Sequence, residues 1–239
     1  LTATQVAGLN ETKIGDLNET QVGAMTTTQI AALTATNAHT LAETQIAALS
    51  TGQVAAMTTG QIAGLDETDM GEFAATHIAA MTTSQIQAIT ATNFAAFADT
   101  QVAALTVAQL GAITATKLAG LDETQVGAFT TAQMAALSTS QLAAFNATKI
   151  SAFADTQIAA LSATQVRAFS AAQLNALQAA DIAEFTTTQI AVMATTQISG
   201  LNATSVGALT ETQIGAMTAT QLQAMLAANV HALSTTQVG

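Results

Sequence analysis

Residues 25–32 read MTTTQIAA, and this eight-residue unit recurs from the start of the chain to its end. The array holds thirty copies, and their consensus is L-T-x-T-Q-I-A-A. Self-similarity at a fixed period is typical of repeat architectures, in which each unit packs on its neighbours. The composition does not change along the chain, so we predict one continuous octapeptide-repeat solenoid over residues 1–239.

Two apolar columns run through the array. Position 1 of the unit is Leu, Met, Ile or Phe in every copy, from Leu1 to Leu233. Position 6 forms the second column, from Val6 to Val238, in which only Ala38 is small. Position 8 is small in almost every copy, so successive coils can stack closely around a continuous apolar core.

Each unit also carries the signature of a helix start. Position 2 is Thr, Ser, Asn or Asp in most copies and position 5 is usually Gln, which is the spacing of a capping box. The residues at positions 1 and 6 then form a hydrophobic staple, and acids such as Glu11 and Glu19 fall in the first turn, beside the positive helix end. These signals agree on a helix of roughly six residues per unit, with a kink at positions 1 and 2.

Two other folds fit the eight-residue period less well. In a single long helix, eight residues at about 100° each overshoot two turns by about 80°, so the apolar stripe would spiral around the helix. In a β-solenoid, favoured by Thr, Ile and Val, positions 1 and 6 would point to opposite faces of one strand. We therefore expect an all-α solenoid of about thirty very short capped helices that are stable only through their neighbours, with a β-solenoid as the alternative.

A longer period of 56 residues, or seven octads, lies within the short one. It relates the position 5 substitutions Asn37, Asn93, Lys149 and Ser205, the acids Glu43, Asp99, Asp155 and Glu211, and a partial acid column of Asp16, Glu72 and Glu184. Duplication of a 56-residue block is the favoured explanation. The other explanation is geometric: seven octads complete a whole number of turns and align these acids along one edge. The number of octads per coil, integer or half-integer, stays open.

Charge and composition exclude several functions. The net charge is −11, because the chain has fifteen acidic residues and only four basic ones, Lys13, Lys117, Lys149 and Arg167. Such a surface repels phosphate backbones, so we expect no nucleic-acid partner. Polar Thr and Gln interrupt every apolar run, which predicts no membrane span. The absence of cysteine excludes disulfides and thiol nucleophiles.

No residue pattern points to a catalytic, cofactor or metal site. The three histidines do not share one repeat position, and we interpret them as solvent-facing substitutions: His39, His77 and His231. The densest acidic cluster lacks the ligand spacing of an EF-hand, and we interpret it as a solvated edge: Asp66, Glu67, Asp69 and Glu72. No serine lies in a nucleophile elbow, so we expect a protein that is not an enzyme.

The stretch from Ala24 to Leu33, AMTTTQIAAL, resembles octapeptide arrays of long, repetitive bacterial proteins that are secreted or surface-bound. The resemblance covers the whole chain and rests on this one motif. It implies an extracellular or cell-surface location and a spacer or adhesion role, with no catalytic residues to carry over. The chain begins and ends within the repeat, which suggests a fragment of a longer protein.

The leading hypothesis is a structural protein: an extracellular spacer, adhesin stalk or filament-forming segment. We expect self-association end to end, or stacking on other repeats of a larger chain, through Leu1 and Val6 at one end and Leu233 and Val238 at the other. The alternative is a surface in which Thr at positions 2 and 4 forms rows that bind ice or a polysaccharide. Those rows are interrupted at Ala42, Ala74, Ala98, Ala154 and Ala194.

Overall fold

The computed structural model describes residues 1–225 and 227–238. Within these residues the chain forms thirty helices of four to six residues each and no strand. The all-α prediction is confirmed, and the β-solenoid alternative is wrong.

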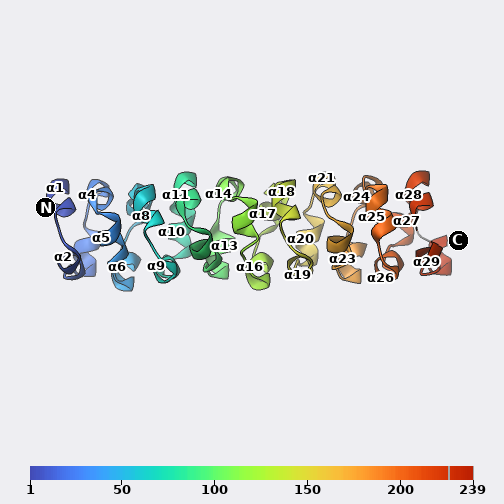
Figure 1. The fold of residues 1–239 in the computed structure, drawn as a ribbon, viewed down its shortest axis with the longest axis horizontal. Helices are drawn as coiled ribbons and strands as arrows, with labels where there is room; N and C mark the ends of the chain where they lie inside the picture. The colour runs from blue at the N-terminus through green and yellow to red at the C-terminus, as the bar shows by residue number, and fades with distance from the viewer. Residues whose placement is uncertain (226, 239) are drawn as a thin grey trace. The chain divides into compact units, whose positions relative to one another are not determined.

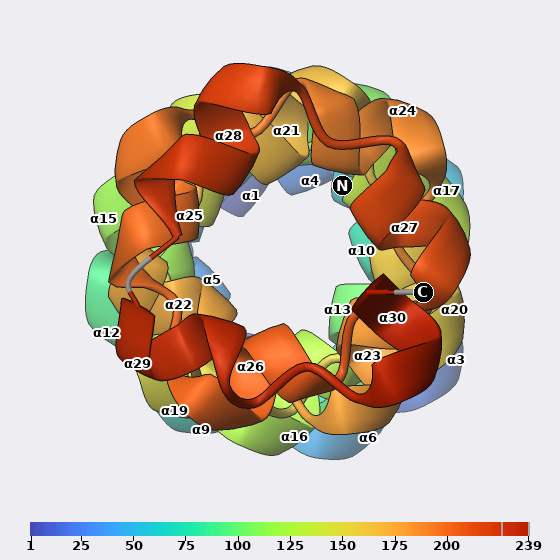
Figure 2. The ribbon, with the colours of Figure 1, turned by 90° about the vertical axis from the view of Figure 1, so that its right-hand side faces the viewer.

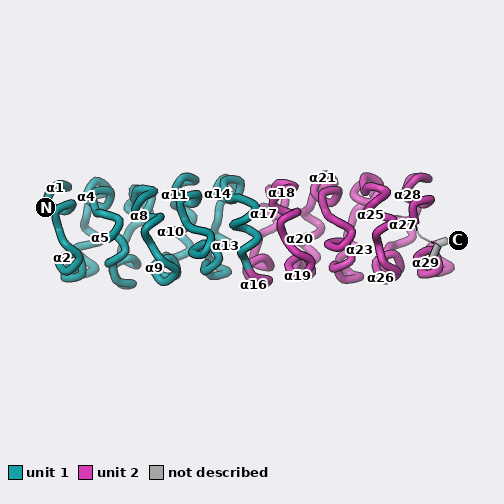
Figure 3. The backbone as a smooth tube through the Cα atoms, in the orientation of Figure 1, with its two compact units in different colours: residues 1–121 teal, residues 122–239 magenta. Residues whose placement is uncertain are grey.

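Contacts divide the chain into two compact units, Leu1–Leu121 and Asp122–Gly239 (Figure 3). The helices of unit 1 are α1 (Ala3–Ala7), α2 (Glu11–Gly15), α3 (Glu19–Gly23), α4 (Thr27–Ala32), α5 (Ala35–His39), α6 (Glu43–Ala47), α7 (Thr51–Ala56), α8 (Thr59–Ala63), α9 (Glu67–Glu72), α10 (Ala75–Ala80), α11 (Thr83–Ala88), α12 (Ala91–Ala95), α13 (Asp99–Ala104), α14 (Val107–Ala112) and α15 (Ala115–Leu118). Those of unit 2 are α16 (Glu123–Gly127), α17 (Thr131–Ala136), α18 (Thr139–Ala143), α19 (Ala147–Ile150), α20 (Asp155–Ala159), α21 (Ala163–Arg167), α22 (Ala171–Leu174), α23 (Ala179–Ala183), α24 (Thr187–Ala191), α25 (Thr195–Gly200), α26 (Ala203–Gly207), α27 (Glu211–Gly215), α28 (Ala219–Ala224), α29 (Ala227–Val230) and α30 (Thr235–Val238). A single continuous solenoid over residues 1–239 stays a prediction.

One octad makes one helix and a connection of two to four residues. At α4, the Thr26 hydroxyl accepts a hydrogen bond from the backbone N–H of Gln29 at 3.2 Å, and the Gln29 side-chain oxygen accepts one from the backbone N–H of Thr26 at 2.6 Å. The helix ends where Leu33 turns extended, with φ −60° and ψ 142°. The next cap, Thr34, follows directly. The capping box therefore sets the helix register, as the sequence predicts.

Helices wind around a common axis within each unit (Figure 1, Figure 2). Within each unit, helices pack on the helix three further along the chain, as in α1 with α4 and α10 with α13 in unit 1, and α25 with α28 in unit 2. No described helix has the length and hydrophobicity that crossing a membrane requires.

The glutamine at position 5 joins one coil to the coil before it. Gln61 donates from Nε2 to the carbonyl of Leu33 at 2.7 Å and to that of Ile30 at 2.8 Å. Leu33 opens the octad three before that of Gln61, and Ile30 belongs to the octad four before it. The side chain therefore lies over the junction of two octads, so one coil holds a non-integer number of octads, between three and four.

This winding bears on the 56-residue period. Two turns of such a coil hold between six and eight octads, so seven octads return the chain close to its starting direction. In unit 2, α21 and α28 are seven octads apart and lie in the same sector of the ring (Figure 2). The geometry thus favours the explanation that seven octads complete a whole number of turns. Duplication of a 56-residue block stays untested.

The octad pattern also sorts its side chains by burial. In the octad from Leu41, the side chains of Leu41, Gln45 and Ile46 are buried at 5, 3 and 1% exposure, while positions 2 to 4 face solvent. Phenylalanine fills the same core, and the rings of Phe94 and Phe97 lie 5.0 Å apart. Because burial of one Leu or Ile contributes about 1.5–3 kcal/mol, two such residues per octad supply the stability that short helices lack.

Candidate functional site

The outer surface of each unit is rich in threonine. Position 4 residues such as Thr28, Thr44 and Thr188 are exposed. At position 2, the Thr186 hydroxyl accepts a hydrogen bond from the backbone N–H of Gln189 at 3.2 Å, so the cap threonines use part of their bonding capacity within the chain. Position 4 therefore offers the freer hydroxyl row.

The predicted solvent-facing role is wrong for His77. This residue replaces Gln at position 5 and is 6% exposed. The backbone N–H of Ala74 donates to Nδ1 at 3.3 Å, and Nε2 lies 2.8 Å from the carbonyl of Leu49. A neutral imidazole with its proton on Nε2 satisfies both partners, so His77 takes over both bonds of the usual glutamine. His231, by contrast, is exposed as predicted.

His39 forms the main departure from the repeat pattern. Its Nδ1 lies 2.6 Å from Oδ2 of Asp69, and the His39 side chain is 47% exposed. The hydrogen bond to Asp69 raises the pKa of His39 above its usual value, and the charge of Asp69 adds to this effect. The two residues lie 30 positions apart, on α5 and α9.

The acidic cluster is the predicted solvated edge only in part: Asp66 and Glu67 are exposed, whereas Asp69 and Glu72 are not. Asp69 is 5% exposed, because it occupies the inward position 5. The backbone N–H of Asp66 donates to Asp69 Oδ2 at 2.9 Å, and that of Asp69 donates to Asp66 Oδ1 at 3.0 Å. Within the described residues, Glu72 Oε2 is a buried oxygen that has no hydrogen-bond partner. Burial raises the pKa of Glu72, and the charges of Asp69 and Glu43 raise it further.

A second buried carboxyl lies in unit 2. Asp181 also replaces Gln at position 5, is 2% exposed, and accepts a hydrogen bond from the backbone N–H of Gln178 at 2.7 Å. Burial raises the pKa of Asp181; the Gln178 hydrogen bond opposes the rise, and a hydrogen bond with Asp155 supports it. Asp155 and Asp181 line a surface hollow of about 380 Å³.

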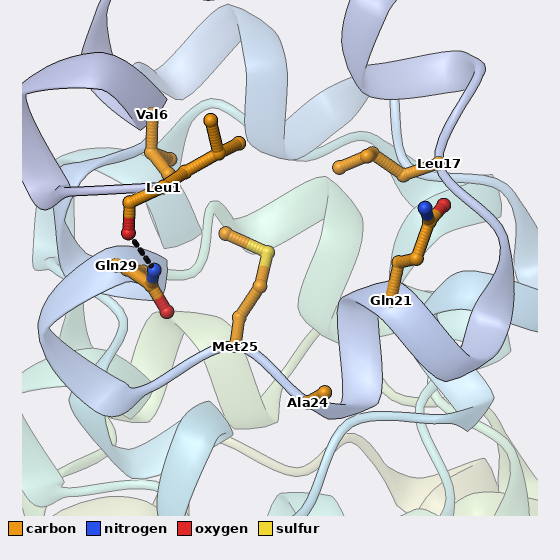
Figure 4. Close-up of a pocket in the computed structure, with 7 residues that line it drawn as sticks. All are labelled: Leu1, Val6, Leu17, Gln21, Ala24, Met25 and Gln29. Carbon is orange, nitrogen blue, oxygen red and sulfur yellow. Dashed lines mark hydrogen bonds between the residues drawn. The ribbon is translucent and has the colours of Figure 1, made fainter.

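The first coil of unit 1 exposes part of its core. Leu1, Leu17 and Met25 surround a hollow of about 300 Å³ (Figure 4). Leu1 is 71% exposed and Val6 is 1% exposed, and both line this hollow, so their predicted joining role stays a prediction.

The last coil of unit 2 has a larger hollow, of about 790 Å³. Leu222 and Val230, each 43% exposed, line it together with Leu233. The side chain of Val238 lies outside what the structure describes, so its predicted joining role is untested.

One signal for the buried carboxyls was present in the sequence. Asp69 and Asp181 both replace the position 5 glutamine. The local sequence indicates position 5 only as the partner of its own cap, because its contact with the preceding coil depends on the winding of the chain. The pairing of His39 with Asp69 had no local signal, because it depends on how many octads make one coil.

The fold and its repeating seam define a helical repeat protein. Residues 102–139 match the family model of the ALTTAQ repeat, which supports a repeat family in this chain. The match leaves the expected bacterial secreted or surface context untested. No curated relative matches the sequence.

Proposed function

We propose that this chain is a structural repeat segment, not an enzyme, and that it acts as an extracellular or cell-surface spacer, stalk or filament segment. One observation carries the proposal: the same seam recurs in both units. Gln85 donates to the carbonyls of Val54 and Met57 at 2.8 and 2.7 Å in unit 1, and Gln213 repeats this pattern in unit 2. Because each coil needs only its neighbours, added octads extend the array without a new core.

Truncation tests the spacer role. We expect removal of residues 184–239, seven octads at the end of unit 2, to shorten the maximum dimension in small-angle X-ray scattering in proportion to the octads removed. A second variant without residues 128–239 should shorten it by about twice as much, since every coil adds the same rise. Circular dichroism checks that each variant keeps its helix content. A maximum dimension that is equal in all three chains contradicts the proposal.

We propose further that the open coils support end-to-end association, either of two copies or with other repeats of a longer chain. Exposed apolar surface supports this proposal, since Leu1 is 71% exposed beside a hollow lined by core residues. We expect Leu1→Asp to weaken association in sedimentation velocity at high concentration. Val107→Asp is the matched control, because Val107 is 48% exposed on α14, away from the first coil. Equal weakening by both variants contradicts an end-to-end contact.

Binding of ice or a polysaccharide is the second candidate, and the exposed threonines at position 4 favour it. Hydroxyls at a fixed spacing can match a regular array of water or sugar hydroxyls. Thermal hysteresis and a glycan array test it. Loss of a signal on replacing Thr28, Thr36 and Thr44 by Val supports the candidate, and the absence of any signal from the unmodified chain removes it.

A further inference from the structure

One group of metal-ligating atoms departs from the repeat. His39 ends α5, Asp66 caps α9 and Asp69 lies in its first turn. One ligand atom from each residue lies within 4.8 Å of the other two. The two aspartates belong to the octad four after that of His39, so the winding of the solenoid brings the group together.

We propose that His39, Asp66 and Asp69 bind a first-row divalent transition metal ion of the Zn²⁺ type. One imidazole nitrogen and two carboxylates form a mixed donor set that suits Zn²⁺ and its neighbours in the series. Calcium prefers oxygen ligands alone, so the imidazole disfavours it. The proposal is independent of the spacer role.

The charge around the group points to a cation. Four carboxylates act on this region: those of Asp69, Asp66 and Glu11 raise the pKa of His39, and those of Asp69, Glu43 and Asp66 raise that of Glu72. A divalent cation bound among these like charges would offset their mutual repulsion.

The present geometry needs a small adjustment to accept the ion. His39 Nδ1 and Asp69 Oδ2 lie 2.6 Å apart, whereas two ligands on a tetrahedral zinc ion lie about 3.3 Å apart. Asp69 is held in place by the backbone N–H of Asp66, so His39, whose side chain is 47% exposed, is the residue that moves. Water completes the coordination at this open edge. The ion then joins the coil of α5 to the coil of α9.

Calorimetric titration of the full chain with ZnCl₂ tests the site. We expect one Zn²⁺ per chain, no comparable binding of CaCl₂, and at least a tenfold loss of Zn²⁺ affinity in His39→Ala and in Asp69→Asn. Asp69→Asn should keep the fold, because Asn37 and Asn93 occupy position 5 elsewhere and reach the preceding coil. Circular dichroism of each variant checks this.

His231→Ala is the matched control, because His231 occupies the same position 7 as His39 and is exposed. We expect this variant to bind Zn²⁺ like the unmodified chain. An unmodified chain that binds no Zn²⁺ at millimolar concentration overturns the proposal. So does a His39→Ala chain with unchanged affinity, or equal losses in His39→Ala and His231→Ala.

Discussion

At the scale of the residue, the position 5 glutamine has two functions. Its oxygen closes the cap of its own helix, and its amide nitrogen reaches the coil before it. An amide is suited to both, because it carries an acceptor and two donors on one group. Residues that replace the glutamine differ in whether they can make the bond to the preceding coil. Asn93 still donates to the carbonyl of Leu65, whereas an ionised aspartate has no proton to donate.

Gln61→Glu separates the two functions. The carboxylate can still accept from the N–H of Thr58, but its second oxygen faces the carbonyls of Leu33 and Ile30. We expect a loss of about 3 kcal/mol in the free energy of unfolding at pH 7, measured by urea denaturation, because a buried charge is left without a donor. Folding then raises the pKa of the new glutamate, so stability should partly return as the pH falls and the carboxyl gains a proton.

Gln21→Glu is the control for this change. Gln21 makes the same cap with Asn18 but is exposed, and its described hydrogen bonds are those of the cap alone. A carboxylate in the first helical turn is tolerated there, so we expect a change of less than about 0.5 kcal/mol. Equal losses in the two variants would show that the seam adds nothing to the cap.

Asp181→Asn makes the opposite change, because it replaces a buried carboxyl at position 5 by an amide. The pKa of Asp181 is raised in the folded chain, so the folded state holds its proton more tightly than the unfolded state. The free energy of unfolding therefore falls as the pH rises from the unfolded value of about 3.9 through the folded pKa. Asparagine removes this dependence and supplies the donor that Asn37 and Asn93 use at position 5.

We expect Asp181→Asn to gain about 1 kcal/mol over the unmodified chain at pH 7 and almost nothing at pH 3, measured by urea denaturation. Asp99→Asn, at an exposed first turn, is the control and should lose a few tenths of a kcal/mol at pH 7 through the helix dipole. If Asp181→Asn gains the same stability at both pH values, the charge of Asp181 is not the cause of the gain.

At the scale of the element, a helix of six residues or fewer depends on how closely it approaches its neighbour. None of the described residues has a positive φ, so the glycines here are not needed for left-handed turns. Gly200 is required for a different reason. A Cβ added to this residue would lie 2.4 Å from Cβ of Ala171, because α25 packs closely on α22.

Gly200→Ala and Gly215→Ala therefore have opposite expected effects. Overlap with Ala171 should destabilise the first variant by about 1–3 kcal/mol. Gly215 also ends a helix, α27, but a Cβ there meets nothing within 4 Å, so alanine should stabilise the second variant by about 0.5–1 kcal/mol. Thermal denaturation compares the two. If both substitutions stabilise the chain, the close approach of α22 and α25 is not a constraint.

The sequence predicts the elements well because their signals are local. The cap at Thr26, the partner at Gln29 and the core residue Ile30 lie within five residues, and the structure confirms each of them. The angle between successive helices leaves no such signal, since it is set by packing around a whole coil. For that reason the amide contact of Gln61, 28 residues away, and the partner of His39, 30 residues away, could not be predicted.

At the scale of the whole molecule, contacts stay between adjacent coils. Within each described unit, the main helix–helix contacts join helices that lie three apart in the chain. Stability in such an array is a sum of local interfaces, unlike that of a globular core, in which damage spreads to every element.

Gln197→Glu tests this additivity. The unmodified side chain donates to the carbonyls of Phe169 and Val166 at 2.7 and 3.0 Å, so the damaged seam lies between the coils of α22 and α25. We expect hydrogen exchange measured by mass spectrometry to accelerate in peptides from about residue 160 to residue 225 and to stay unchanged in residues 1–100, because a weakened interface opens only its own neighbours. Gln21→Glu serves as the mutational control, with little change anywhere. Acceleration by one factor across the entire chain would mean that the coils unfold as a single cooperative body, and a repeating nearest-neighbour seam would then not be what stabilises the array.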